Sequence, residues 1–263
     1  MGMLCCSVVA KPTAKGHMLK AYRGEIPQGY NFWIYTPLGY DTITRPVPVV
    51  IFLHGASLCG RNLERVRRYG PLDAVAKGRE IPAVIIAPQN PGGPWVPQKI
   101  IDILSWTEQH FNVDSTRVYA IGMSLGGYGT LDLVGTFPEK IAAGMALCGG
   151  CTLKDQNRLG ELPLWIMHGT ADRAIPVRYS KVVVEGMISR HQALRLRYDW
   201  LPGASHGALA RIFYLPEAYQ WLFSHTLTDE NRPVSREIDI TLQTMSHAYK
   251  DLTNRGTTLT VVP

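Results

Sequence analysis

The chain has 263 residues, of which 46% are hydrophobic and 18% are charged, and its formal net charge is +6. This length and apolar content suffice for one large α/β domain, and the low share of charged residues excludes a disordered protein or one with an acidic tail. Because no run interleaves basic and aromatic residues, we predict no nucleic-acid partner.

The first ten residues resemble the end of a secretory signal peptide. The segment MLCCSVVA is apolar and has small residues at its third-last and last positions, Val8 and Ala10, before a polar stretch. We therefore expect residues 1–10 to be a signal-peptide remnant and the protein to be secreted or periplasmic. A buried or frayed N-terminal segment of a cytoplasmic protein is the alternative. No other segment approaches the length of a membrane-spanning helix.

Apolar and β-branched runs alternate along the chain with amphipathic segments of helical length. We expect strands at 31–35, 47–53, 83–87, 117–121, 143–147, 164–167 and 194–199. We expect helices at 63–77, 100–110, 125–137, 177–191 and 216–226. The central strands are continuously apolar, which is typical of strands buried on both faces. The pattern predicts a mostly parallel central sheet with helices on both faces.

The pattern also indicates how the chain is divided. One α/β domain is expected to span residues 11–227, and residues 228–263 are a tail of unknown role, either an edge hairpin or a docked segment. An arginine cluster in the expected helix at 63–77 and just before it is interpreted as a solvated helix face; its members are Arg61, Arg65, Arg67 and Arg68.

The segment YAIGMSLGGYG places Ser124 between an expected strand and an expected helix. A residue in so sharp a turn is forced toward positive φ, and its neighbours must then be small, as Gly122 and Gly126 are. The turn raises the serine hydroxyl above the sheet edge at the positive end of the helix dipole. The segment therefore predicts that Ser124 is a nucleophile.

A serine hydroxyl needs a base to accept its proton and an acid to orient that base. In this type of sheet both follow the nucleophile, acid before histidine, each just past a strand end. Asp172 follows the strand at 164–167 and His206 follows the strand at 194–199. We therefore predict the triad Ser124, Asp172 and His206. Asp199 is the weaker candidate acid because it lies within a strand pattern.

Negative charge on a tetrahedral intermediate requires nearby hydrogen-bond donors. The segment LHGASLCG follows the strand at 47–53, and its small side chains leave backbone N–H groups free to point inward. We assign the oxyanion hole to the N–H groups of Ala56 and Leu125, with Ser57 as the fallback. His54 is expected to hydrogen-bond the loop.

The pair Cys148 and Cys151 has the two-residue spacing of redox and zinc motifs. No second pair completes a zinc site, and no clear helix pattern follows. We favour structural thiols or a local disulfide over redox catalysis.

The motifs LHGASLCG, GMSLGG, MHGTADRAIPV and GASHG resemble those of the α/β-hydrolase fold. More closely, they are similar to the small esterases grouped with feruloyl and acetyl-xylan esterases, phospholipase/carboxylesterase-like enzymes and "predicted peptidases". The resemblance covers about residues 30 to 226. It implies a serine esterase that forms an acyl-enzyme and needs neither a metal nor an organic cofactor.

The substrate is expected to be a feruloyl or acetyl ester of a plant polysaccharide. About 16 residues separate the strands at 143–147 and 164–167, too few for a large lid, so the cleft should be open. Trp95 and Ser57 are candidate substrate contacts, although Trp95 could equally anchor its loop. A serine peptidase, a general small-ester carboxylesterase and a non-catalytic binding module on this scaffold are the alternatives. The oligomeric state is not indicated by the sequence.

Overall fold

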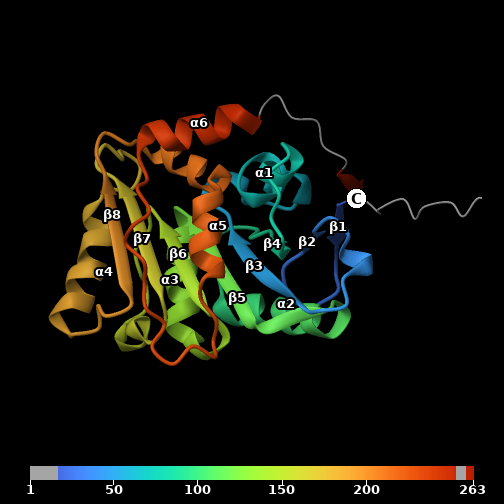
Figure 1. The fold of residues 1–263 in the computed structure, drawn as a ribbon, viewed down its shortest axis with the longest axis horizontal. Coiled ribbons are helices and arrows are strands. Elements are labelled where there is room, and N and C mark those ends of the chain that lie inside the picture. The colour runs from blue at the N-terminus through green and yellow to red at the C-terminus, as the bar shows by residue number, and fades with distance from the viewer. Residues whose placement is uncertain (1–16, 253–258) are drawn as a thin grey trace, which may run out of the picture.

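The computed structural model describes residues 17–252 and 259–263, which form one sheet of nine strands between two helical layers (Figure 1). The predicted signal-peptide remnant, residues 1–10, lies outside the described residues. The spatial order of the strands is β8-β7-β6-β5-β3-β4-β2-β1-β9. Their bounds are β1 Met18–Tyr22, β2 Phe32–Thr36, β3 Val47–Leu53, β4 Val84–Pro88, β5 Val113–Met123, β6 Ala143–Leu147, β7 Leu164–Gly169, β8 Leu196–Leu201 and β9 Thr260–Val262.

The sheet is parallel from β8 through to β4, which confirms the predicted mostly parallel arrangement. Only β2 runs against its neighbours, pairing antiparallel with β4 and β1. All seven predicted strands are present, and β3 and β6 have the predicted bounds. Because the carboxyl ends of parallel strands share one edge, β3, β5, β7 and β8 deliver the loops that follow them to the same place.

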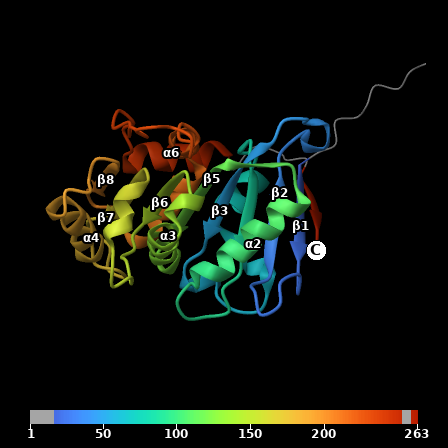
Figure 2. The ribbon, with the colours of Figure 1, turned by 90° about the horizontal axis from the view of Figure 1, so that it is seen from below.

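The helices cover both faces of the sheet, as Figure 2 shows from below. Helices α2, α3 and α4 pack in one apolar core, and α1, α5 and α6 pack in the other. The bounds are α1 Pro71–Ala76, α2 Pro97–His110, α3 Leu125–Thr136, α4 Arg178–Ser189, α5 Pro216–Phe223 and α6 Leu242–Leu252. Among the residues described, no helix is both long and apolar enough to cross a membrane.

The helix predicted at 63–77 is interrupted. A 3-10 helix covers Leu63–Arg68, and α1 starts only at Pro71. Between them Gly70 has φ 92°, and a Cβ there would overlap the ring of Phe52. Since only glycine fits this close approach in this conformation, the chain turns here instead of continuing as a helix.

The residues after 227 pack on the domain as a docked segment. Met245, Ala248 and Leu252 of α6 are buried in the core that also contains α1 and α5. Strand β9 then pairs in parallel with β1 at the edge of the sheet. The tail is therefore a helix and an edge strand, in place of an edge hairpin.

Candidate active site

Ser124 forms a sharp turn between β5 and α3. Its backbone has φ 59° and ψ −121°, a region that non-glycine residues rarely occupy. Its N–H donates to the carbonyl of Leu147 in β6 at 2.9 Å, which fixes the turn against the sheet. A Cβ on Gly126 would overlap the Leu53 carbonyl oxygen. Strained backbone held by such tight packing is characteristic of a nucleophile turn.

Asp172 and His206 are brought together by the loops after β7 and β8. The Asp172 Oδ2 atom accepts a hydrogen bond from Nδ1 of His206 at 2.7 Å. The other oxygen, Oδ1, accepts the N–H groups of Ala174 and Ile175, each at 2.9 Å. The Asp172 side chain is fully buried, whereas that of His206 is 25% exposed. The carboxylate is thus fixed on both oxygens, and His206 Nε2 is left to exchange a proton with substrate or nucleophile.

His168 braces the turn that carries Asp172. Its Nε2 lies 2.8 Å from the Ile175 carbonyl and 3.3 Å from Asp172 Oδ2, and its Nδ1 lies 2.7 Å from Ser180 Oγ. Burial lowers the pKa of the His168 ring from its ordinary value. These contacts position the loop that carries Asp172.

Cys148 lies where the three predicted triad residues meet. Its Sγ, a carboxylate oxygen of Asp172 and a ring nitrogen of His206 lie within 4.8 Å of one another. The thiol also contacts the backbone of Ser124. Within the described residues, however, no hydrogen bond joins Ser124 Oγ to His206. The structure therefore places the serine beside the Asp172–His206 pair, and the complete relay remains a prediction.

The side chains of Cys148, Asp172 and His206 are also of the types that bind zinc. Here two of the three are already joined to each other by a hydrogen bond.

The loop after β3 presents free backbone donors. Gly55 N–H donates to the hydroxyl of Tyr69 at 2.6 Å, so this N–H is already engaged. The N–H groups of Ala56 and Leu125 donate to no acceptor in the part of the chain described. A Cβ on Gly55 would lie 3.0 Å from Tyr69 Oη and 3.3 Å from Ser124 Cβ, so the loop adjoins the nucleophile. This geometry suits the predicted oxyanion hole.

Tyr69 was not anticipated from the sequence. Its ring packs edge-on against Phe52, with the ring centroids 5.9 Å apart, and is tilted against Phe213 at a centroid distance of 6.1 Å. Its hydroxyl accepts the Gly55 N–H and so holds the loop after β3, which we call the oxyanion loop. Burial raises the pKa of Tyr69 to about 12, so the hydroxyl stays protonated at neutral pH. The Tyr-Gly dipeptide that interrupts the expected helix was the only signal in the sequence.

Trp95 does not present its ring to a substrate, contrary to that expectation. It is 3% exposed, and its Nε1 donates to the His54 carbonyl at 3.2 Å. His54 in turn accepts the Asn90 N–H at Nε2 and lies 2.8 Å from the Gly55 carbonyl through Nδ1. Through its hydrogen bond to His54, Trp95 therefore anchors the loop after β3. Its indole also fills the space beside Gly129.

Ser57, in the loop after β3, is held by Arg65 of the 3-10 helix Leu63–Arg68. Ser57 is exposed, and its carbonyl accepts Nη2 of Arg65 at 2.7 Å. Arg65, which was expected to belong to a solvated helix face, thus also holds the loop after β3.

The other candidates are held elsewhere. Asp199 accepts Trp165 Nε1 at 2.6 Å and Arg197 Nε at 2.9 Å within the β7–β8 region, so it does not orient His206. Cys148 and Cys151 are both free thiols, and Cys151 Sγ lies 3.5 Å from Asp132 Oδ1. The local disulfide is therefore absent among the described residues, and the structural role of the two thiols stays a prediction.

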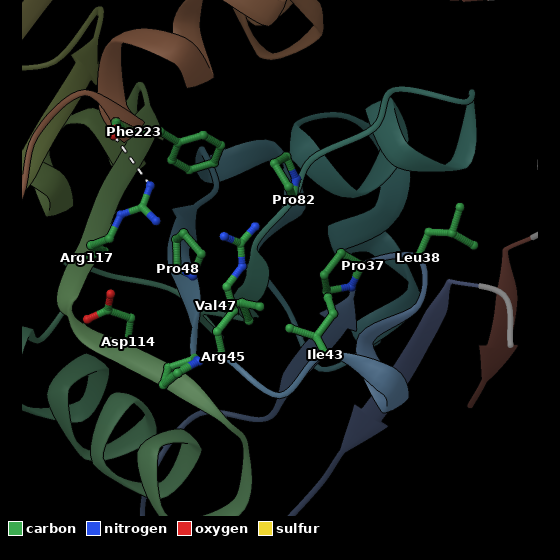
Figure 3. Close-up of a pocket in the computed structure, with 11 residues that line it drawn as sticks. Pro37, Leu38, Ile43, Arg45, Val47, Pro48, Pro82, Asp114, Arg117 and Phe223 are labelled. Atoms are coloured by element: carbon green, nitrogen blue, oxygen red, sulfur yellow. Dashed lines mark hydrogen bonds between the residues drawn. The ribbon is translucent and has the colours of Figure 1, made fainter. Parts of the chain in front are cut away.

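Two hollows matter for ligand access. One of about 500 Å³ lies directly beside His206 and is lined by Ala171, Arg173, Ala174, Ser205, His206 and Gly207. The other, of about 540 Å³, contains Arg45 and Arg117 and opens near the start of β3 and β5 (Figure 3). Ser124 and the oxyanion loop follow the opposite ends of these two strands, so only the first hollow adjoins the site.

Comparison with known proteins gives distant relatives only. No protein-family model matches the chain. Acetylxylan esterase A of Aspergillus ficuum is 25% identical over 155 residues, which cover 52% of this chain and 48% of that protein. Feruloyl esterase B of Thermothelomyces thermophilus is 27% identical over 147 residues, 49% of this chain and 48% of that protein. The chain spans about half the length of these curated relatives.

Among solved structures, a thermostable esterase superposes with a TM-score of 0.65. It is 24% identical in sequence, and the match covers 78% of this chain and 62% of that one. At this identity the likeness describes the fold.

Proposed function

We propose that this chain, which has the α/β-hydrolase fold and is distantly related to acetylxylan and feruloyl esterases, hydrolyses carboxylic esters through an acyl-serine intermediate. One observation carries the proposal: a buried carboxylate, fixed by two backbone N–H groups, orients a partly exposed imidazole beside a strained serine turn. Backbone strain of this kind costs free energy and is concentrated at functional sites.

In the first half of the reaction, Ser124 Oγ attacks the ester carbonyl while His206 Nε2 accepts the hydroxyl proton. Asp172 keeps the proton on Nδ1 and stabilises the imidazolium that forms. The carbonyl oxygen becomes an oxyanion and is bound by the N–H groups of Ala56 and Leu125. Each such donor is typically worth about 100-fold or more in rate.

The tetrahedral intermediate then collapses to the acyl-serine, and His206 gives its proton to the leaving alkoxide, which departs as the alcohol. In the second half-reaction, water donates a proton to His206 as it attacks the acyl-serine. The second intermediate releases the carboxylic acid and returns the proton to Ser124. The two half-reactions consume one ester and one water and produce one acid and one alcohol.

We further propose acetyl or feruloyl esters of polysaccharides as the substrates. The names of the curated relatives support this class, and so does the short connection of 16 residues between β6 and β7, which leaves no room for a large helical lid. The hollow beside His206 is open to solvent and could receive part of a polymer. Secretion would suit such a substrate and stays a prediction from residues 1–10.

The experiment that tests the proposal combines a covalent probe with a substrate panel. A fluorophosphonate should label wild-type protein and should not label Ser124→Ala. Released acid should be measured from methyl ferulate, nitrophenyl acetate, acetylated xylan and a peptide amide, with Ser115→Ala, an exposed serine at the opposite end of β5, as the matched control. Labelling of Ser124→Ala, or turnover of the amide alone, would contradict ester hydrolysis at Ser124.

A further inference from the structure

The hollow beside His206 has only one permanently charged side chain, that of Arg173. We propose that Arg173 forms a subsite for a carboxylate carried by the alcohol portion of the ester, so that the enzyme prefers acidic polysaccharides over neutral ones. This inference rests on the proposed function, whose site it extends.

The walls of the hollow leave room for a ligand. Four of the six lining residues, Ala171, Ala174, Ser205 and Gly207, have small side chains or none. The remaining two are the imidazole of His206 and the guanidinium of Arg173. A ligand that enters here therefore meets one cation and one proton donor, with little bulk to exclude it.

The backbone on both sides of the hollow is held in place. Arg173 lies between Asp172 and Ala174, and the Ala174 N–H donates to Asp172 Oδ1 at 2.9 Å. The loops after β7 and β8 are joined by Ala171 N–H to the Ala204 carbonyl at 3.1 Å and by Gly203 N–H to Thr170 Oγ1 at 2.9 Å. The backbone that carries the Arg173 side chain is thus fixed relative to Asp172 and His206.

The guanidinium itself is available. Arg173 is exposed, and it makes no hydrogen bond, ion pair or ring contact with the rest of the described chain. The acid next to it in sequence, Asp172, is fully buried and already bonded to His206 and two backbone amides. Arg173 therefore retains all its donors for a ligand.

The reaction geometry indicates which part of the substrate lies there. His206 must deliver a proton to the leaving oxygen, so the alcohol portion lies on the His206 side of Ser124. The carbonyl oxygen lies toward Ala56, on the loop after β3. The hollow beside His206 consequently receives the alcohol, which in a polysaccharide ester is the sugar chain.

The chemistry of the site favours a carboxylate. A planar guanidinium can bind both oxygens of a carboxylate with two parallel hydrogen bonds, and one cation matches the single negative charge. The net charge of +6 also favours the approach of a polyanion. A uronic acid residue next to the esterified sugar would supply this group.

The test compares two small esters that differ only by one carboxylate, nitrophenyl acetate and acetoxy-nitrobenzoate. In Arg173→Ala we expect KM for the carboxylated ester to rise about five-fold, a size typical of an exposed ion pair. We expect kcat and KM for the neutral ester to stay unchanged. Arg173→Lys should restore part of the preference, and Arg173→Glu should reverse it. Arg178→Ala, which removes an exposed arginine of α4 outside the hollow, is the matched control.

A second measurement separates this inference from the proposed function. Binding of a de-esterified xylo-oligosaccharide with one glucuronic acid should be titrated by calorimetry into wild type and Arg173→Ala, because binding needs no turnover. Loss of affinity in Arg173→Ala supports the subsite even if neither ester is hydrolysed, in which case the proposed function fails alone. Equal changes for both esters, or equal affinity of both proteins, would overturn the subsite.

Discussion

Replacing Asp172 by asparagine tests the relay at its most constrained point. The two N–H groups of Ala174 and Ile175 both donate to Oδ1, so the amide oxygen of the introduced side chain must take that place. The amide nitrogen then faces Nδ1 of His206 at the position where Oδ2 now lies 2.7 Å away. Two donors cannot share this contact, and the proton of the neutral imidazole moves to Nε2.

The magnitude follows from the alternatives that the introduced asparagine has. Rotating the amide to restore the acceptor at His206 would leave two buried N–H groups facing an NH2 group. At about 1 kcal/mol for each lost hydrogen bond, that arrangement is unfavourable by about 2 kcal/mol or more. The wrong tautomer therefore dominates by about 30-fold for 2 kcal/mol, and its Nε2–H cannot accept the Ser124 proton. The neutral amide also no longer stabilises the imidazolium, and for both losses together we expect kcat to fall by about 10,000-fold, as for other triads.

The assay is the turnover of nitrophenyl acetate from pH 5 to pH 9, with thermal melting to confirm folding. Asp199→Asn is the matched control because that carboxylate likewise accepts hydrogen bonds, in its case from two side chains, yet lies outside the site, and its kcat should stay near wild type. A loss of less than ten-fold in Asp172→Asn would refute the argument and would require another acid.

Two further predictions follow from the site and its supports. Tyr69→Phe keeps the ring contacts with Phe52 and Phe213 but removes the acceptor of the Gly55 N–H, so kcat should fall about ten-fold with KM and melting temperature nearly unchanged; an unaltered kcat would remove Tyr69 from the support of the oxyanion loop. Burial lowers the pKa of both His54 and His225 from 6.5 to about 4, so below pH 6.5 the unfolded chain binds more protons than the folded one. The free energy of unfolding, measured with urea, should therefore decrease as pH falls from 6.5 to 4, with His54 contributing up to about 1.4 kcal/mol per pH unit. A flatter profile in His54→Asn combined with His225→Asn would assign the effect to these rings, and an undiminished slope in that variant would contradict the assignment.

The sequence predicted the parts of the fold that burial dictates. Strands β3 and β6 are apolar at almost every position and are buried throughout, so their bounds could be identified from composition alone. The serine turn could be identified because its glycines have no substitute in so close a packing. Asp172 was found because its position after a strand is fixed by the order of parallel strands.

The remaining features depend on contacts between distant residues. The direction of the Trp95 indole is set by His54, 41 residues away, and no local pattern encodes it. Tyr69 reaches Gly55 only because Gly70 redirects the chain against Phe52. In the tail, the alternation of apolar residues near Ile240 is compatible with the edge hairpin that was one of the two expectations. The helical spacing of Met245, Ala248 and Leu252 instead determines α6.

The docking of α6 has a consequence for His206, the proposed general base. His206 is the first residue of the 3-10 helix His206–Tyr214, and α6 packs on that helix. Tyr249 of α6 meets Tyr214 edge-on at 4.9 Å and lies below the Arg211 guanidinium at 6.0 Å. Helix α6 thus supports the 3-10 helix that begins at His206, the proposed proton acceptor, and we expect that loosening α6 would slow ester hydrolysis before it unfolded the sheet.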